Sequence, residues 1–300
     1  MSETDTPRQT DTLAEAQQWC ASFATKHREN FDVASKLLLG DELRHAYFAL
    51  YAFARGADDR ADEQLESGDG ASAANRALDE WQRELNSVYD ENSAPSHPAF
   101  VALQDVVERH HIERELFQRM IDAFRQDQFI KRYETWSDLR EYTAGSADPV
   151  GRWVLRVHGY RSPAMDAWSD AICTGLQLVN FLQDVREDFE KRDRVYLPKK
   201  DMRRFGVEEA MFSVSPTIEP VRELLRYEAK RAEYLFATGR ELLDNVDPKL
   251  RKQLILFHGG GRLALHALRK ADYDVCSRHI SASRMSRAAL LVRAVRGKPL

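Results

Sequence analysis

The sequence predicts an all-α protein folded as one domain. Two observations favour this fold. Apolar residues recur at helical spacing through most of the chain, and no stretch offers several alternating strands in succession. Short segments rich in Gly, Pro, Ser and Asn separate the periodic stretches, as is typical of loops between helices. We therefore expect functional groups to lie on facing helices inside a bundle.

The N-terminal part of the chain predicts three amphipathic helices after a polar, disordered tail at residues 1–12. Residues 13–27 place Leu13, Ala16, Trp19, Cys20 and Phe23 on one face. Residues 41–62 carry a wide apolar stripe, and residues 71–90 follow a Ser-Gly-Asp-Gly loop. With this tail removed, we expect the folded domain to span residues 13–296.

Further helices are expected along the rest of the chain. Ser162-Pro163 opens the longest of them, which should stop before Pro198. The others are predicted at residues 98–110, 113–125, 138–145, 149–159, 218–243, 247–258, 261–270 and 283–295. The run Gly259–Gly261 is expected to be a loop that joins two helices. It lacks the strand and the spacing of a dinucleotide-binding loop, so no nicotinamide cofactor is expected.

The bulk composition excludes several classes of protein. The net charge is −4 and no basic domain stands out, so nucleic acid is not an expected partner. Cys20, Cys173 and Cys276 lie far apart without a CxxC pair, which argues against a disulfide framework or a zinc site. No apolar run approaches the roughly 18 residues that span a bilayer. We expect a cytoplasmic protein.

Two acidic stretches lie in otherwise apolar helices. Asn180, Asp184 and Asp188 recur every four residues and form one polar ridge, and Asp58 and Asp62 repeat this spacing upstream. Each stretch alone would most often be a solvated helix end. Because buried carboxylates are costly without a positive partner, the two together indicate Mg²⁺, with Mn²⁺ as an alternative, carrying a phosphorylated substrate.

Polar neighbours extend both stretches. Tyr51 and Arg55 share a face with Asp58 and Asp62, and a guanidinium suits phosphate. The alternative for Arg55 is a surface ion pair with Asp59 or Asp62. Gln177 lies three residues before the ridge. Arg194 follows it and has two open interpretations, as a phosphate ligand or as a charge that balances the acidic helix end.

The last predicted helix, residues 283–295, is basic and amphipathic. Arginines accompany Leu290, Leu291, Val292 and Val295, and no acid follows Asp274. Such a helix either completes the bundle with a solvated basic face or lies on an anionic membrane. A peripheral position at the inner face of the membrane therefore stays open beside a purely cytoplasmic one.

These residues resemble the squalene and phytoene synthases. Tyr51, Arg55, Asp58, Asp59 and Asp62 match the family pattern Y-x-x-x-R-x-x-D-D-x-x-D. The second pattern, Q-x-x-N-x-x-x-D-x-x-x-D followed by R-x-Y-L-P, is matched by Gln177, Asn180, Asp184, Asp188, Arg194 and residues 196–198. The resemblance runs from about residue 14 to about residue 294 and implies an isoprenoid-synthase-type bundle with a central active-site cavity.

Within this family, the hydroxysqualene synthases of bacterial hopanoid pathways are the most similar group. Residues 29–35 resemble their E-N-F-P-V-x-S, residues 180–184 their N-F-W-Q-D, and residues 146–151 their S-A-N-P-V-G. Three positions depart from the family: Asp148 stands where an asparagine is usual, Thr143 replaces a cysteine, and an arginine often found next is replaced around residues 144–145. These departures concern the substrate more than the metal chemistry.

The resemblance implies that Mg²⁺ binds presqualene diphosphate, which ionises and is captured by water as hydroxysqualene. A presqualene diphosphate synthase of the same pathway is an implied partner. The implied metal ligands are Asp58, Asp59, Asp62, Asn180, Asp184 and Asp188. The implied catalytic residues are Asp58, Asp62, Asp184, Asp188 and Tyr51. The implied substrate-binding residues are Asn30, Phe31, Arg55, Tyr142, Gln177, Phe181, Arg194 and Tyr196. The alternatives are a head-to-head condensation of two prenyl diphosphates, giving presqualene diphosphate, squalene or phytoene, and a non-catalytic assembly partner.

Overall fold

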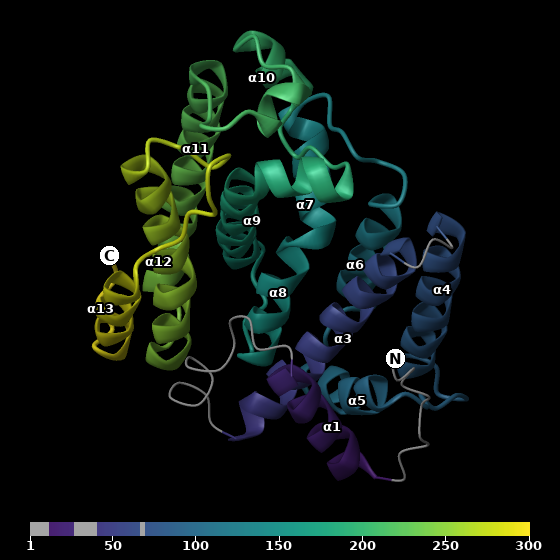
Figure 1. Ribbon diagram of the computed structural model, residues 1–300. Coiled ribbons are helices and arrows are strands. Elements are labelled where there is room, and N and C mark those ends of the chain that lie inside the picture. The colour runs from purple at the N-terminus through teal and green to yellow at the C-terminus, as the bar shows by residue number, and fades with distance from the viewer. Residues whose placement is uncertain (1–11, 27–40, 67–69) are drawn as a thin grey trace. The chain divides into compact units, whose positions relative to one another are not determined.

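The computed structural model describes residues 12–26, 41–66 and 70–300 (Figure 1). Within the helix at 41–66, the side chains of residues 41–42 and 62–66 lie outside this description. The described chain is mostly helical, and its β pairing is one isolated bridge between Arg132 and Val195. The all-α prediction is confirmed. No described helix is long and apolar enough to cross a membrane.

The chain forms two compact units, each described here by itself. The first contains residues 1–129 and 153–161, and the second contains residues 130–152 and 162–300. The predicted boundaries of a single domain, 13 and 296, stay a prediction. The three cysteines are free, as expected from their spacing.

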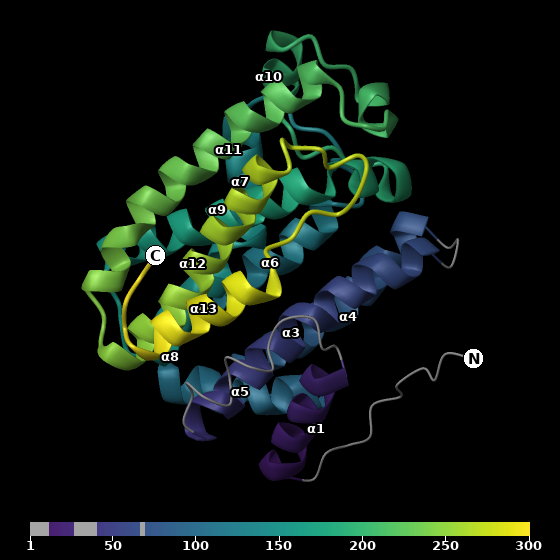
Figure 2. The ribbon, with the colours of Figure 1, turned by 60° about the vertical axis from the view of Figure 1, so that its left-hand side comes forward.

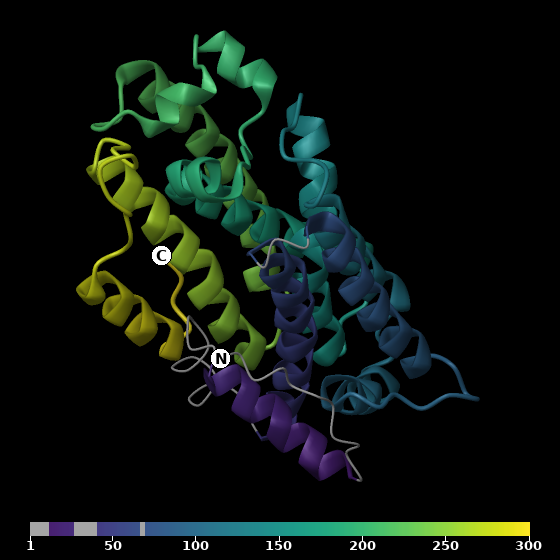
Figure 3. The same ribbon diagram turned by 45° about the vertical axis from the view of Figure 1, so that its right-hand side comes forward.

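The helices of the first unit surround an aromatic core. They are α1 (Leu13–Lys26), α3 (Asp41–Glu66), α4 (Gly70–Val88), α5 (Pro98–His110) and α6 (Arg114–Gln126). The Phe53 ring is fully buried, with the rings of Phe117 and Trp153 at 5.0 and 5.9 Å. A Cβ on Gly56 would lie 2.6 Å from the Trp81 ring, so this glycine allows α3 and α4 to pack closely (Figure 3).

The helices of the second unit are longer. They are α7 (Trp136–Ser146), α8 (Asp148–Val157, whose last five residues belong to the first unit), α9 (Pro163–Arg192), α10 (Lys199–Arg204), α11 (Glu219–Gly239), α12 (Pro248–Lys270) and α13 (Arg284–Val295). Two 3-10 turns, Glu209–Ser213 and Arg240–Asp244, complete them. Helix α9 packs against α11 and α12, and α13 lies along α12 (Figure 2).

The predicted loop at Gly259–Gly261 is wrong, because α12 continues through all three glycines. Close packing against neighbouring helices explains why glycines occur within α12. A Cβ on Gly259 would lie 2.5 Å from Leu290 of α13, and one on Gly261 would lie 2.3 Å from Phe236 of α11. The glycines thus allow neighbouring helices to approach α12, and they do not break it.

The boundaries of α9 agree with the sequence prediction. Pro163 occupies the first turn, where its missing N–H is no loss. At the other end Asp193 adopts a left-handed conformation with φ of 52°, and the backbone N–H of Arg194 donates to the Asp188 carbonyl at 2.9 Å. The predicted polar ridge therefore lies on one continuous helix.

Candidate functional site

The ridge of α9 passes from solvent into the protein. Asn180 is exposed, Asp184 is half-buried, and Asp188 is buried with 7% of its surface exposed. Burial raises the pKa of Asp188 to about 6, against the opposing effect of a hydrogen bond from Arg192. Burial also raises the pKa of Asp184, against the opposing effect of His279. This end of the helix therefore favours an additional positive charge.

Arg192 already supplies part of that charge, and the His279 ring also contacts the ridge. Arg192 Nη1 lies 2.9 Å from Asp188 Oδ1, and His279 Nδ1 lies 3.3 Å from Asp184 Oδ1. The buried Arg194 acts electrostatically to lower the pKa of Asp188. Of the two interpretations of Arg194, this structure supports the one in which it balances the acidic helix end. Its role as a phosphate ligand stays a prediction.

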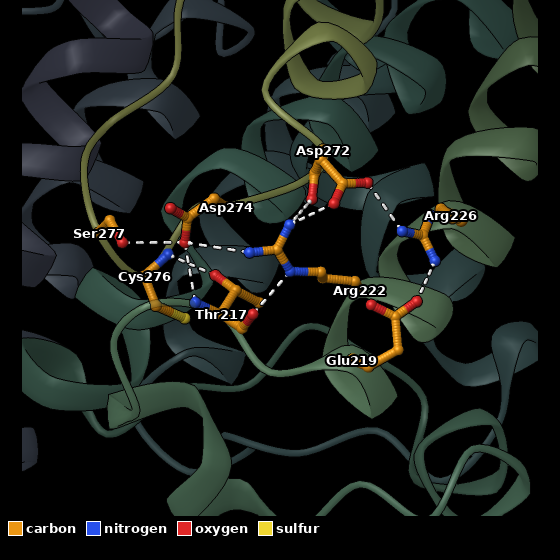
Figure 4. A network of polar contacts seen from close by, with 8 residues as sticks. All are labelled: Thr217, Glu219, Arg222, Arg226, Asp272, Asp274, Cys276 and Ser277. Carbon is orange, nitrogen blue, oxygen red and sulfur yellow. Dashed lines mark hydrogen bonds and ion pairs between the residues drawn. The ribbon is translucent and has the colours of Figure 1, made fainter.

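The segment 272–280, between α12 and α13, carries His279 and is fixed at the start of α11. Figure 4 shows this network of polar contacts. Arg222 Nε donates to the Thr217 carbonyl at 2.6 Å, and Arg222 Nη1 donates to the Asp272 carbonyl at 2.8 Å. The Thr217 N–H donates to Asp274 Oδ1 at 2.8 Å, and the Cys276 N–H donates to Thr217 Oγ1 at 2.9 Å.

Helix α9 fixes the same segment from the other side. Gln183 Nε2 donates to the Ile280 carbonyl and Arg186 Nη1 donates to the Cys276 carbonyl, both at 2.5 Å. The segment 272–280 is thus attached to α11 and to α9, and this double attachment places the His279 ring beside Asp184. Sequence reasoning missed His279, since it lies far downstream of Asp184 and belongs to no recognised pattern.

Three residues predicted to bind substrate come together in one aromatic stack. The rings of Phe181 and Tyr196 lie 4.0 Å apart and are nearly parallel, at 9°. Tyr142 adds a third ring, 5.6 Å from Tyr196 and 6.5 Å from Phe181. All three are buried. Phe181 directly follows Asn180, so the stack begins beside the ridge, and the half-buried Gln177 lies one turn earlier.

The acidic stretch of α3 lies in the first unit. Arg55 Nε lies 2.7 Å from Asp59 Oδ1, and Arg55 Nη1 lies 3.3 Å from Asp58 Oδ2. The ion pair that the sequence left open for Arg55 is therefore present, and Tyr51 is half-buried one turn earlier. Asp62 lies in α3, but its side chain is outside the described set. Asn30 and Phe31 are outside the described residues altogether.

A second buried acidic group, which the sequence did not predict, lies near the start of α8. Asp148 Oδ2 lies 2.7 Å from Arg140 Nη2, and Thr174 Oγ1 donates to Asp148 Oδ1 at 2.8 Å. Asp170 forms two hydrogen bonds with Arg152 close by. Burial, with a contribution from the Asp170 charge, raises the pKa of Asp148 to about 7. Asp148 is one of the departures from the family pattern.

The donor set of α9 fits a hard divalent cation. Within the described side chains, no three of the His, Cys, Asp or Glu groups gather closely enough to hold a metal ion alone. The ridge nevertheless offers oxygen donors on successive turns, and two of its carboxylates have a raised pKa. Mg²⁺ uses one or two such carboxylates and completes its shell with water and phosphate oxygens.

Comparison with known proteins gives a consistent family assignment. The family model described as squalene/phytoene synthase matches residues 24–287. A hydroxysqualene synthase from Zymomonas mobilis is 36% identical over 182 residues, which cover 59% of this chain and 57% of that protein. A phytoene synthase from Arthrospira platensis is 28% identical over 88% of this chain and 87% of its own length.

A solved structure gives the same assignment. The crystal structure of squalene synthase HpnC from Alicyclobacillus acidocaldarius superposes with a TM-score of 0.78. The two chains are 37% identical, and the match covers 87% of this chain and 96% of the other. The similarity extends through both units, because so large a share of this chain is covered.

Proposed function

This chain belongs to the squalene/phytoene synthase family, and we propose that it converts presqualene diphosphate and water into hydroxysqualene and diphosphate. The observation that carries this proposal is the composition of α9, where carboxylates with raised pKa values adjoin a stack of aromatic rings. The carboxylates suit a metal-bound diphosphate, and the rings suit the carbocation that its departure creates.

The reaction begins with heterolysis of the bond between the substrate carbon and the diphosphate oxygen, which leaves a cyclopropylcarbinyl cation. Asp184, Asp188 and Asn180 would hold Mg²⁺ on α9. Asp58 and Asp59 are the candidates for holding a cation on α3. Mg²⁺ bound there supplies Lewis-acid stabilisation of the departing diphosphate. The cation then rearranges, water adds to it, and loss of one proton gives the alcohol.

Side chains of the protein would stabilise the carbocation and contact the diphosphate. The ring faces of Phe181, Tyr196 and Tyr142 that are not covered by the stack itself would stabilise positive charge by up to about 2 kcal/mol each in a dry pocket. Their burial favours this, since water would otherwise screen the charge. The Gln177 amide and the Arg55 guanidinium are candidates for contacts with diphosphate oxygens, for which they have suitable donors.

One assay distinguishes the proposed reaction from its nearest rival. The purified protein is incubated with Mg²⁺ and either presqualene diphosphate or farnesyl diphosphate, each with and without NADPH. We expect hydroxysqualene from presqualene diphosphate without NADPH. Formation of product only from farnesyl diphosphate would overturn the proposal in favour of head-to-head condensation. That alternative is favoured by the similarity to phytoene synthases over most of the chain.

A non-catalytic assembly role is the second alternative. A pseudoenzyme would be expected to lose carboxylates from its acidic stretches, yet Asp58, Asp59, Asp62, Asp184 and Asp188 are all present. The same assay tests this alternative, because absence of product with every prenyl diphosphate would support it.

A further inference from the structure

We propose that α13 docks the protein onto membranes containing anionic phospholipids, with the helix lying parallel to the membrane surface. The proposal concerns a surface other than the α9 ridge, and it holds for any of the reactions considered above. It rests on the exposed side chains of α13, on their charge, and on the way α12 fixes the opposite face of the helix.

Helix α13 exposes a continuous apolar stripe. Met285, Val292 and Val295 are 82%, 50% and 42% exposed, and Ala288 and Ala289 between them are exposed as well. Their spacing of three, four and seven residues places them along one side of an α-helix. Single exposed apolar residues are ordinary, but a contiguous set on one short helix indicates an interaction surface.

The opposite side of α13 packs against the rest of the protein. Leu290 and Ala294 are buried, and the missing Cβ of Gly259 in α12 leaves the space that the Leu290 side chain occupies. Helix α13 is therefore fixed by its inner face, and the apolar stripe cannot be an inner face left uncovered. Figure 2 shows α13 packed along α12.

The stripe is flanked by uncompensated positive charge. Residues 275–300 contain six Arg or Lys and no Asp or Glu. The exposed cations of α13 and its end are Arg284, Arg287, Arg293, Arg296 and Lys298. Among the described residues, no carboxylate forms an ion pair with any of them. By contrast, Arg222, Arg226 and Arg240 of α11 and its following turn all pair with carboxylates.

An anionic lipid surface fits this combination better than a protein partner does. Basic side chains on both sides of an apolar stripe are typical of helices that lie in the membrane interface, where the stripe enters the acyl boundary and the cations meet headgroups. An acidic protein surface would satisfy the arginines, but it would offer no comparable place for Met285, Val292 and Val295.

Vesicle flotation tests the proposal with the full chain and without substrate. The vesicles contain phosphatidylcholine alone or three parts phosphatidylcholine to one part phosphatidylglycerol. We expect flotation with the anionic vesicles, little with the neutral ones, and weaker binding as salt is raised. Met285→Ser with Val292→Ser should lower the partition coefficient about tenfold, and Arg284→Gln with Arg287→Gln should lower it by a similar factor.

Matched controls distinguish binding through this surface from nonspecific binding to the vesicles. Tyr234→Ser removes a side chain that is 73% exposed on α11, and Arg119→Gln removes an exposed cation from α6. Neither should change flotation. Equal binding of the α13 variants and the wild type would overturn the proposal, as would absence of binding to anionic vesicles. Sedimentation that showed a dimer abolished by the Met285 and Val292 changes would instead identify an interface between two copies. Because no step requires turnover, failure here is distinct from failure of the proposed reaction.

Discussion

Helices α3 and α9 carry similar acidic stretches but neutralise them in different ways. On α3 the cation comes from the same helix, since Arg55 contacts both Asp58 and Asp59, and all three side chains are partly exposed. On α9 Arg192 of the same helix pairs with Asp188, but Asp188 is buried, and Asp184 contacts His279 from a distant segment. The first arrangement is local and solvated, whereas the second depends in part on tertiary structure.

The two units that contain these helices differ in the same way. The described core of the first unit is apolar and aromatic around Phe53, and its buried polar residues are few: Asp127, Gln128 and Arg156. The second unit buries many more, among them Asp148, Asp170, Asp188, Arg194, Asp201 and Glu228. Buried charges are costly unless paired, so the second unit is the more sensitive of the two to pH and to single polar substitutions.

The largest expected effect comes from removing a carboxylate of either acidic stretch. Asp184→Ala and Asp58→Ala should each lower kcat about 10³-fold or more, because a preorganised charge that stabilises the leaving group is lost. Turnover of presqualene diphosphate measures the effect, and far-UV circular dichroism should show unchanged helical content. Glu187→Ala is the matched control on α9, since its exposed carboxylate pairs only with Lys191 among the described residues. Wild-type rates in Asp184→Ala would refute the assignment of the ridge.

The next largest expected effect concerns the aromatic core of the first unit. Phe53→Ala should lower the free energy of unfolding by about 3–5 kcal/mol, because the cavity cannot be refilled among four fixed rings. Urea denaturation followed by tryptophan fluorescence measures it. Phe129→Ala removes an exposed ring of the same type and should change stability by less than about 0.5 kcal/mol. Equal effects in the two variants would contradict the packing described for this unit.

The sequence alone was sufficient to predict the local features of the site. Helical periodicity alone places Phe181 beside Asn180 and Asp184, and it places Arg55 within reach of Asp58 and Asp59. These relations are fixed by one helix, and the structure reproduces them. The pair of Arg192 with Asp188, four residues apart, follows from the same rule.

Relations between distant segments were not predictable from the sequence. The contact of His279 with Asp184 depends on how the segment 272–280 crosses α9, which no local pattern encodes. The glycines at 259–261 were mistaken for a helix break because propensity penalises glycine, whereas packing against Leu290 and Phe236 outweighs that penalty. The burial of Asp148 was likewise not predictable from the sequence, because burial is set by tertiary structure.

Asp148 tests whether buried charge weakens the second unit. A carboxyl whose pKa rises on folding destabilises the folded protein wherever it is ionised. This penalty is absent below about pH 4 and grows until about pH 7, the value to which the pKa of Asp148 is raised. Asp148→Asn should therefore stabilise the protein by about 1–3 kcal/mol at pH 8 and by less than half of that at pH 5.

Thermal unfolding from pH 5 to pH 8 measures this difference. Asp244→Asn is the control, because hydrogen bonds from Arg251 and Arg240 lower the pKa of that exposed carboxyl. Its contribution to stability is lost only as the pH falls below the unfolded value, so its effect should be constant from pH 5 to pH 8. A pH-independent difference between Asp148→Asn and the wild type would contradict the burial argument.

The smallest expected effect concerns the attachment of the segment 272–280, which distinguishes α9 from α3. Arg222→Ala removes the bonds to the Thr217 and Asp272 carbonyls and should loosen the segment that holds His279 beside Asp184 (Figure 4). We expect faster hydrogen exchange at the Cys276 N–H and a loss of about five- to tenfold in kcat/KM, equivalent to about 1–1.4 kcal/mol. Arg226→Ala is the matched control, because Arg226 pairs with Glu219 and Asp272 at the edge of this network (Figure 4), and it should lower kcat/KM less than twofold. If Arg222→Ala left the exchange at Cys276 unchanged, the bonds from Thr217 and from Gln183 and Arg186 of α9 would be sufficient to hold the segment, and the role proposed for Arg222 would be refuted.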